Sequence, residues 1–142
     1  MGARRTARER ALQALFQLDG EPAATTAGGA LESAWGASDD EGPKDPAAHS
    51  FALEIVEGVR AKLTEIDPLL EQHSHNWRLD RMARVDRNVL RLGVFELQYC
   101  ADIPRKVTIN EGIELAKKFG NEESASFING LLDRVAVAVN KA

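Results

Sequence analysis

Apolar residues recur along most of the chain at the three- and four-residue spacing of amphipathic helices. The clearest stripe runs from residue 51 to residue 70 as one continuous face, and Pro68 is predicted to kink this helix or to begin a new one. A further stripe covers residues 127–139. The opening segment carries a similar face, made of Ala11, Leu12, Leu15 and Phe16.

The segment from Val85 to Tyr99 is apolar on nearly every side, which is typical of a helix at the centre of a bundle. Pro104 is expected to stop it. The next helix is predicted to start at Thr108, because Thr108 and Glu111 have the spacing of a capping box. Gly120 is its expected C-cap.

No segment shows the alternation of a strand, so the sequence predicts an all-α protein with about six or seven helices. The pattern breaks between residues 20 and 46, where prolines, glycines and acidic residues accumulate. This stretch is interpreted as a flexible acidic connection with one short helix around Ala30–Trp35.

The composition narrows the class of protein. The chain of 142 residues is long enough for one domain, predicted to span residues 1–142. The single cysteine, Cys100, excludes an intrachain disulfide and a cysteine-rich zinc finger and indicates a reducing compartment. No run approaches the roughly 18 apolar residues of a membrane span, and the charged N-terminus does not have the pattern of a signal peptide.

Charge is unevenly distributed, although the formal net charge is only −4. Residues 1–10 carry four arginines, and residues 78–91 carry five, whereas the 19–46 segment is strongly acidic. Arginines in the first turns of a helix oppose the macrodipole, so local stability does not explain them. They suit a polyanionic partner, or they belong to a solvated basic tail; their number alone favours neither.

Motifs for catalysis are not recognised. The sequence has no phosphate-cradling glycine loop, no HExxH and no GxSxG. His73 and His75 lie two residues apart, on different faces of a helix, and are interpreted as ordinary surface histidines. Cys100 is interpreted as a small core residue. We therefore expect no catalytic residue, metal or cofactor. Phe127 fits the core by its periodicity or, next to Gly130, a surface position where a base can stack.

Four ordered motifs together resemble the NusB family of bacterial transcription antitermination factors. The first is the arginine-rich opening ARRTARERALQALF of residues 3–16. The second is RNVLRLGVFEL of residues 87–97. The third and most specific is IPRKVTINEGIELAKKFG of residues 103–120, followed by SASFINGLLD of residues 124–133. The likeness covers about residues 3–137, with about residues 20–46 as a variable insert.

The resemblance implies a two-lobed helical bundle that binds boxA-type single-stranded RNA together with the ribosomal protein NusE. It further implies loading onto an RNA polymerase antitermination complex, notably in ribosomal RNA operons, in the cytoplasm. By position, the implied RNA contacts are Arg4, Arg5, Arg8, Arg10, Lys106, Lys117 and Phe127. The implied contacts with NusE are Phe16, Asp80 and Asp86.

The chain departs from the family pattern at a few of these positions. Thr6 stands where a third consecutive arginine is common, and Phe16 stands where a tyrosine is frequent. Asp80 and Asp86 replace glutamates, which shortens their reach. These departures affect the roles of single residues more than the family assignment.

Two other interpretations remain. The same helical module resembles the N-terminal part of certain rRNA cytosine methyltransferases, but no cofactor-binding motif follows it here. The protein could alternatively be a protein-only scaffold whose arginines are merely solvated; steep salt dependence of RNA binding would separate the two cases. The sequence also leaves open a homodimer, since some members of the family are dimers.

Overall fold

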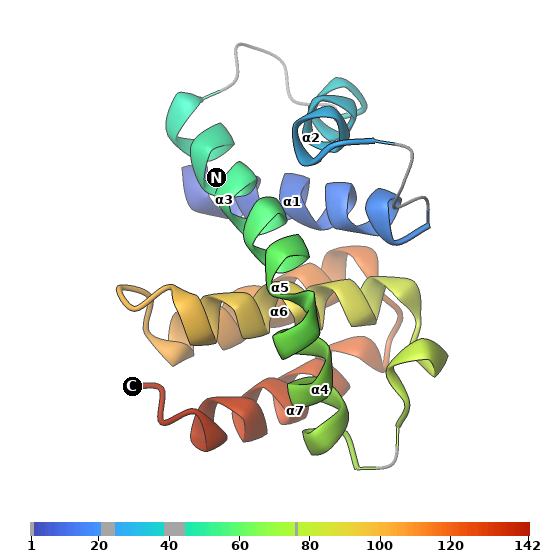
Figure 1. Cartoon of the computed structure of the whole chain (residues 1–142), viewed down its shortest axis with the longest axis vertical. Coiled ribbons are helices and arrows are strands. Elements are labelled where there is room, and N and C mark those ends of the chain that lie inside the picture. The colour runs from blue at the N-terminus through green and yellow to red at the C-terminus, as the bar shows by residue number, and fades with distance from the viewer. Residues whose placement is uncertain (1, 21–24, 39–44, 76) are drawn as a thin grey trace. The chain divides into compact units, whose positions relative to one another are not determined.

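The computed structural model describes residues 2–20, 25–38, 45–75 and 77–142 (Figure 1). Within these ranges every regular element is helical, which confirms the predicted all-α class. None of these helices is both long and apolar enough to cross a membrane. The elements are α1 (Ala3–Gly20), α2 (Ala27–Gly36), α3 (Pro46–Ala61), α4 (Leu63–His73), the short 3-10 helix η1 (Leu79–Arg81), α5 (Arg84–Tyr99), α6 (Arg105–Phe119) and α7 (Ser124–Ala138).

The chain forms two compact units, and the first comprises Met1–Gly58. In this unit α1 packs against α2, with Leu12, Leu15 and Leu31 buried. Helix α2 is the short helix expected within the acidic connection. It begins where Thr26 Oγ1 accepts a 3.0 Å hydrogen bond from the amide of Gly29, as an N-cap does. The acidic connection was predicted to be flexible. Two parts of it, residues 21–24 and 39–44, lie outside the described residues.

The second unit comprises Val59–Ala142 and is organised around α5, which contacts α4, α6 and α7. The expected central helix is thus confirmed. Leu132 of α7 is fully buried and fits against two glycines. A Cβ atom on Gly93 of α5 would lie 2.7 Å from Leu132 Cδ2, and one on Gly112 of α6 would lie 3.0 Å from its Cδ1. The two glycines therefore make room for this leucine where the three helices meet.

The predicted continuous helix over residues 51–70 is wrong. The chain leaves helical geometry at Lys62, where φ is −108° and ψ is 13°, and α4 starts at Leu63. Pro68 does not begin a helix; it lies inside α4, where it removes one main-chain donor. The apolar spacing continues across Lys62, which is why periodicity alone suggested a single element.

The predicted capping role of Thr108 is also wrong. Helix α6 begins at Arg105 with Pro104 as its N-cap, so Thr108 lies one turn inside the helix. Its hydroxyl donates a 2.9 Å hydrogen bond to Oε1 of Glu96 in place of capping an amide. The other end agrees with expectation, because Gly120 is the C-cap. A Cβ there would lie 2.6 Å from Ser124 Oγ and 2.8 Å from the Ala116 carbonyl oxygen, so a side chain does not fit.

Candidate nucleic-acid and partner interface

The arginine-rich start of α1 separates into an exposed and a buried part. Arg4 and Arg5 are exposed, whereas Arg8 and Arg10 retain only 3% and 6% of their accessible surface. The first turn contains no acidic residue to offset the helix dipole. At the surface of this helix start, the side chains available to a polyanion are therefore those of Arg4 and Arg5.

Phe51 of α3 lies against two of these arginines. The guanidinium carbon of Arg4 is 4.6 Å from the centroid of the Phe51 ring, and that of Arg8 is 5.4 Å from it. Both distances are within the range of cation–π attraction. Arg10 donates from Nη1 to Gln13 Oε1 at 2.9 Å. Arg8 and Arg10, both predicted to contact RNA, thus have buried side chains in this structure. The contact of Phe51 with Arg4 and Arg8 was not evident from the sequence.

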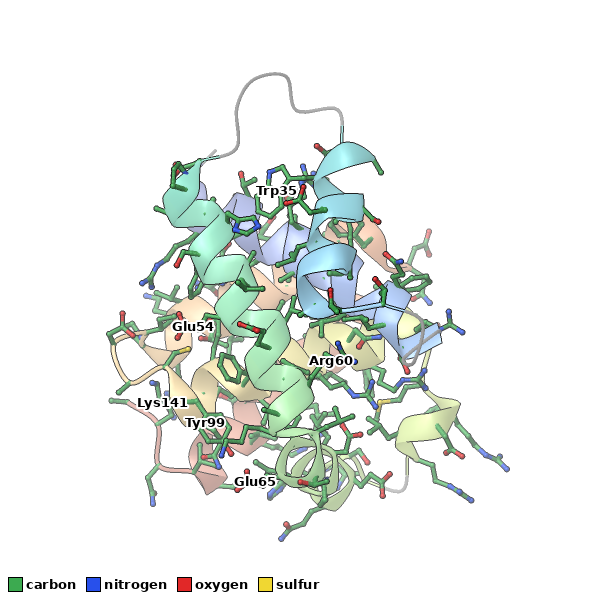
Figure 2. The ribbon with its side chains drawn as sticks, turned by 45° about the horizontal axis from the view of Figure 1, so that its top comes forward. Trp35, Glu54, Arg60, Glu65, Tyr99 and Lys141 are labelled. Carbon is green, nitrogen blue, oxygen red and sulfur yellow. The ribbon has the colours of Figure 1, made fainter. Side chains whose placement is uncertain are left out.

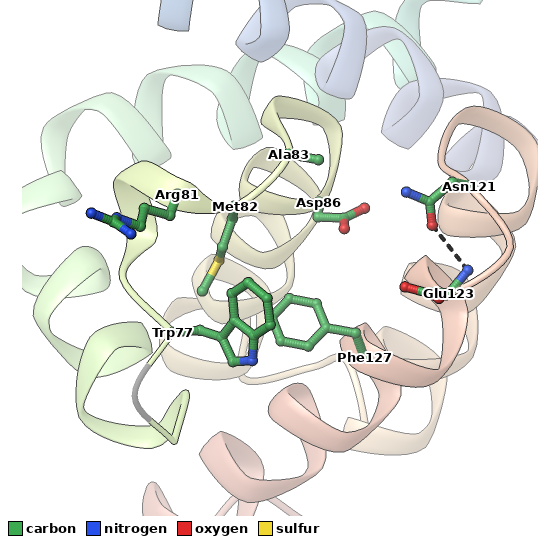
Figure 3. Close-up of a pocket in the computed structure, with 8 residues that line it drawn as sticks. All are labelled: Trp77, Arg81, Met82, Ala83, Asp86, Asn121, Glu123 and Phe127. Carbon is green, nitrogen blue, oxygen red and sulfur yellow. Dashed lines mark hydrogen bonds between the residues drawn. The ribbon is translucent and has the colours of Figure 1, made fainter.

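The second unit contains a pocket of about 250 Å³ beside η1 and the first turns of α5 and α7 (Figure 3). The rings of Trp77 and Phe127 meet there edge to face, with centroids 6.3 Å apart. Trp77 keeps 58% of its surface exposed, and Phe127 is half-buried. Phe127 was predicted to lie either in the core or at the surface. Its position is intermediate between the two. The pocket is lined by Trp77, Arg81, Met82, Ala83, Asp86, Asn121, Glu123 and Phe127.

Asp86 gives this pocket a buried acidic wall. It lies in the first turn of α5, where a negative charge is favoured by the helix dipole. The residue is only 9% exposed, and its Oδ1 atom is buried without a hydrogen-bond partner. In Figure 3 its carboxylate points toward the side of the pocket that carries Asn121. A buried acceptor without a donor carries a desolvation cost, which a donor entering the pocket would relieve.

The structure thus brings together two residues that the sequence had assigned to different partners. Phe127, predicted to contact RNA, and Asp86, predicted to contact NusE, line one pocket. Trp77, Arg81 and Asn121 share it and were not among the predicted site residues. The sequence contains only weak signals that these residues line a site. Trp77 follows a helix in a turn, and Arg81 is one of the five arginines of residues 78–91.

The remaining predicted residues are exposed. Phe16 on α1 keeps 40% of its surface accessible. Asp80 in η1 forms an ion pair with Arg78, with 3.2 Å between Oδ1 and Nε. Lys106 stands in the first turn of α6 and Lys117 in its last turn, where its ammonium lies 3.9 Å from Glu114 Oε1. These exposed ion pairs are weak and leave the side chains accessible to a partner.

A third feature of the second unit lies between α4 and the end of α5. Burial raises the pKa of Tyr99, and a hydrogen bond and the negative charge of Glu65 raise it further. Figure 2 labels both residues. The ammonium of Lys62 lies 5.3 Å from the centre of the Tyr99 ring and 3.5 Å from Glu65 Oε2. The described residues contain no group of three or more potential metal-binding side chains.

Exposed arginines on one helix and an aromatic pocket with an acidic wall define the class: a small helical protein equipped for recognition of RNA or protein. The NusB family model matches residues 5–137. The transcription antitermination protein NusB of Myxococcus xanthus is 67% identical over 141 residues, which are 99% of each chain. The chain belongs to the NusB family.

Solved structures agree with this assignment. NusB of T. maritima has a TM-score of 0.83 at 36% identity, covering 96% of this chain and 92% of that one. A structure of the antitermination factors NusB and NusE in complex with dsRNA has a TM-score of 0.82 at 26% identity, covering 96% and 97%. The family likeness inferred from the four sequence motifs is thereby confirmed.

Proposed function

We propose that this protein is a transcription antitermination factor that binds boxA-type single-stranded RNA together with the ribosomal protein NusE. The single observation that carries the proposal is the structural match, over 96% of this chain, to a structure of NusB and NusE in complex with dsRNA. We further propose that the complex loads onto RNA polymerase and promotes readthrough of ribosomal RNA operons, in the cytoplasm.

RNA binding is assigned to three sets of side chains. Arg4 and Arg5 are exposed at the start of α1 and suit phosphate contacts, which position a strand without reading its bases. Phe127 is half-buried beside Trp77, so one face of this aromatic pair can take a splayed base. Lys106 and Lys117, both exposed on α6, add positive charge for the backbone. Arg8 and Arg10 are proposed to support the arginine helix from within.

NusE binding is assigned to Phe16, Asp80 and Asp86. Phe16 offers an exposed aromatic ring, and Asp80 offers a solvated carboxylate. Asp86 offers an acceptor whose Oδ1 lacks a donor. Carboxylates suit a basic ribosomal protein, because complementary charge accelerates encounter.

The protein-only scaffold is the alternative that this proposal must exclude by experiment. The methyltransferase module is less favoured, since the Myxococcus relative is covered over 99% of its own length by a chain of this size. Salt dependence separates RNA binding from a solvated basic surface, because each neutralised phosphate steepens the fall in affinity.

The proposal is tested by fluorescence anisotropy with a boxA-like RNA and a scrambled RNA of the same composition. Each is titrated with the protein alone and with NusE present, at two salt concentrations. We expect preference for the boxA-like RNA, increased by NusE and weakened by salt. Equal binding of both RNAs with and without NusE would contradict it. Analytical ultracentrifugation of the same samples reports whether the protein acts as a monomer or as a homodimer.

A further inference from the structure

Phe51 occupies an unusual position for a core phenylalanine. It is 8% exposed on α3, yet its ring contacts two cationic side chains. Arg4 and Arg8 are four residues apart on α1, so they share one face of that helix. One ring from a distant segment of the sequence therefore meets both guanidinium groups.

The Phe51 ring acts against two unfavourable interactions of the Arg4 and Arg8 charges. Like charges four residues apart on a helix repel each other, and the positive end of the α1 dipole adds a second unfavourable contribution. The negative face of an aromatic ring attracts cations and offsets part of both effects. Since the ring is almost fully covered, it cannot itself stack on a base. Any influence of Phe51 on RNA must act through the arginines.

The two arginines differ in exposure, which suggests a division of roles. Arg8 is only 3% exposed. Arg4 is exposed to solvent, and its guanidinium carbon nevertheless lies 4.6 Å from the centre of the Phe51 ring. An arginine already held in one orientation loses less conformational freedom when it binds a phosphate than a freely rotating one.

We propose that Phe51 is a positioning residue for RNA binding, which holds the Arg4 guanidinium ready for a backbone phosphate, with Arg8 as the inner support. This inference rests on the proposed RNA-binding function. It adds to the RNA site a residue that touches no RNA.

The test is a double-mutant cycle on RNA affinity. Phe51→Leu removes the ring and keeps an apolar side chain, and it should weaken boxA RNA binding about two- to fivefold, the change expected for one exposed cation–π contact. In the Arg4→Ala background the same substitution should have almost no further effect. Phe51→Tyr keeps the ring and should restore most of the affinity.

A matched control is Phe95→Leu. Phe95 is also buried, at 6% exposure, but its ring lies against that of Tyr99, with centroids 5.6 Å apart. It should lower the melting temperature without changing RNA affinity. The slope of log affinity against log salt adds a second readout: Phe51→Leu should reduce it toward the value of Arg4→Ala, an effect that loss of packing does not produce. If Phe51→Leu loses its helical circular dichroism signal, Phe51→Met replaces it.

Three outcomes would overturn the inference while wild-type RNA binding persists. They are unchanged affinity in Phe51→Leu, a loss that simply adds to that of Arg4→Ala, and an equal loss in Phe95→Leu. A wild-type protein that fails to bind the boxA-like RNA is a different result. It removes the proposed function and this inference together.

Discussion

The hydroxyl of Thr108 on α6 donates a 2.9 Å hydrogen bond to Oε1 of Glu96 on α5, and the two residues are 2% and 0% exposed. Thr108→Val keeps the shape and removes the donor from a buried acceptor. We expect a loss of about 1–3 kcal/mol in the free energy of unfolding. Urea denaturation measures it, with Thr108→Ser as the control that keeps the hydroxyl. Equal stability of the valine variant would show that this bond contributes nothing to folding.

The raised pKa of Tyr99 predicts that the stability of the fold depends on pH in the alkaline range. Its pKa is raised above the ordinary 10.0, so the folded state favours the neutral phenol. The associated stabilisation is fully present below pH 10.0 and is lost as the pH rises through the raised value. Because Tyr99 is the only tyrosine, tyrosinate absorbance reports its titration directly. Glu65→Gln should lower the pKa, and an unchanged titration curve in that variant would remove Glu65 as a cause.

Phe127→Ala tests the aromatic pair in the pocket. If a base stacks there, the substitution should cost about 1–3 kcal/mol of RNA affinity. Trp77 gives a second readout, because its ring lies 6.3 Å from that of Phe127. In a Trp35→Phe background Trp77 is the sole tryptophan, and RNA should change its emission. A steep fall in melting temperature with unchanged RNA affinity would instead assign Phe127 to the core.

The two aspartates that are proposed to bind NusE should contribute differently to NusE affinity. Asp80 is exposed and already pairs with Arg78, whereas Asp86 is buried with an Oδ1 that lacks a donor. Asp86→Asn should therefore weaken NusE binding more than Asp80→Asn, by about tenfold if a charge-assisted hydrogen bond is lost. Calorimetric titration with NusE measures both. Glu123→Gln, in the same pocket, is the control. An equal loss of NusE affinity in that variant would mean that the negative charge of the pocket matters, and not a specific hydrogen bond to Asp86.

The sequence was sufficient for the features that depend on local pattern. Periodicity located the helical faces, the short helix within the acidic connection was anticipated, and Gly120 was identified as a C-cap. Local pattern misplaced two boundaries for one physical reason. Apolar spacing continues across Lys62 although the helix breaks there, and Thr108 has the spacing of a cap although its hydroxyl bonds a side chain from another helix.

The contacts that define the candidate site are mostly nonlocal, which explains what the sequence could not indicate. Phe51 meets Arg4 from a distant helix, and periodicity shows only that Phe51 is buried. The pocket joins Trp77, Asp86 and Phe127 from three segments. The burial of Arg8 and Arg10 runs against the ordinary preference of arginine for solvent, so composition could not reveal it.

Leu132 has a consequence for molecular recognition that extends beyond packing. Its side chain fills the space left by Gly93 and Gly112, so α5, α6 and α7 cannot slide past one another without a clash or a void. Asp86 and Phe127 stand on two of these interlocked helices, and Lys117 stands on the third. Their mutual spacing is therefore set at folding, before any ligand arrives. If Phe127 and Lys117 contact RNA as proposed, the distance between them is fixed, and the flexible RNA strand would have to adapt its conformation to the protein.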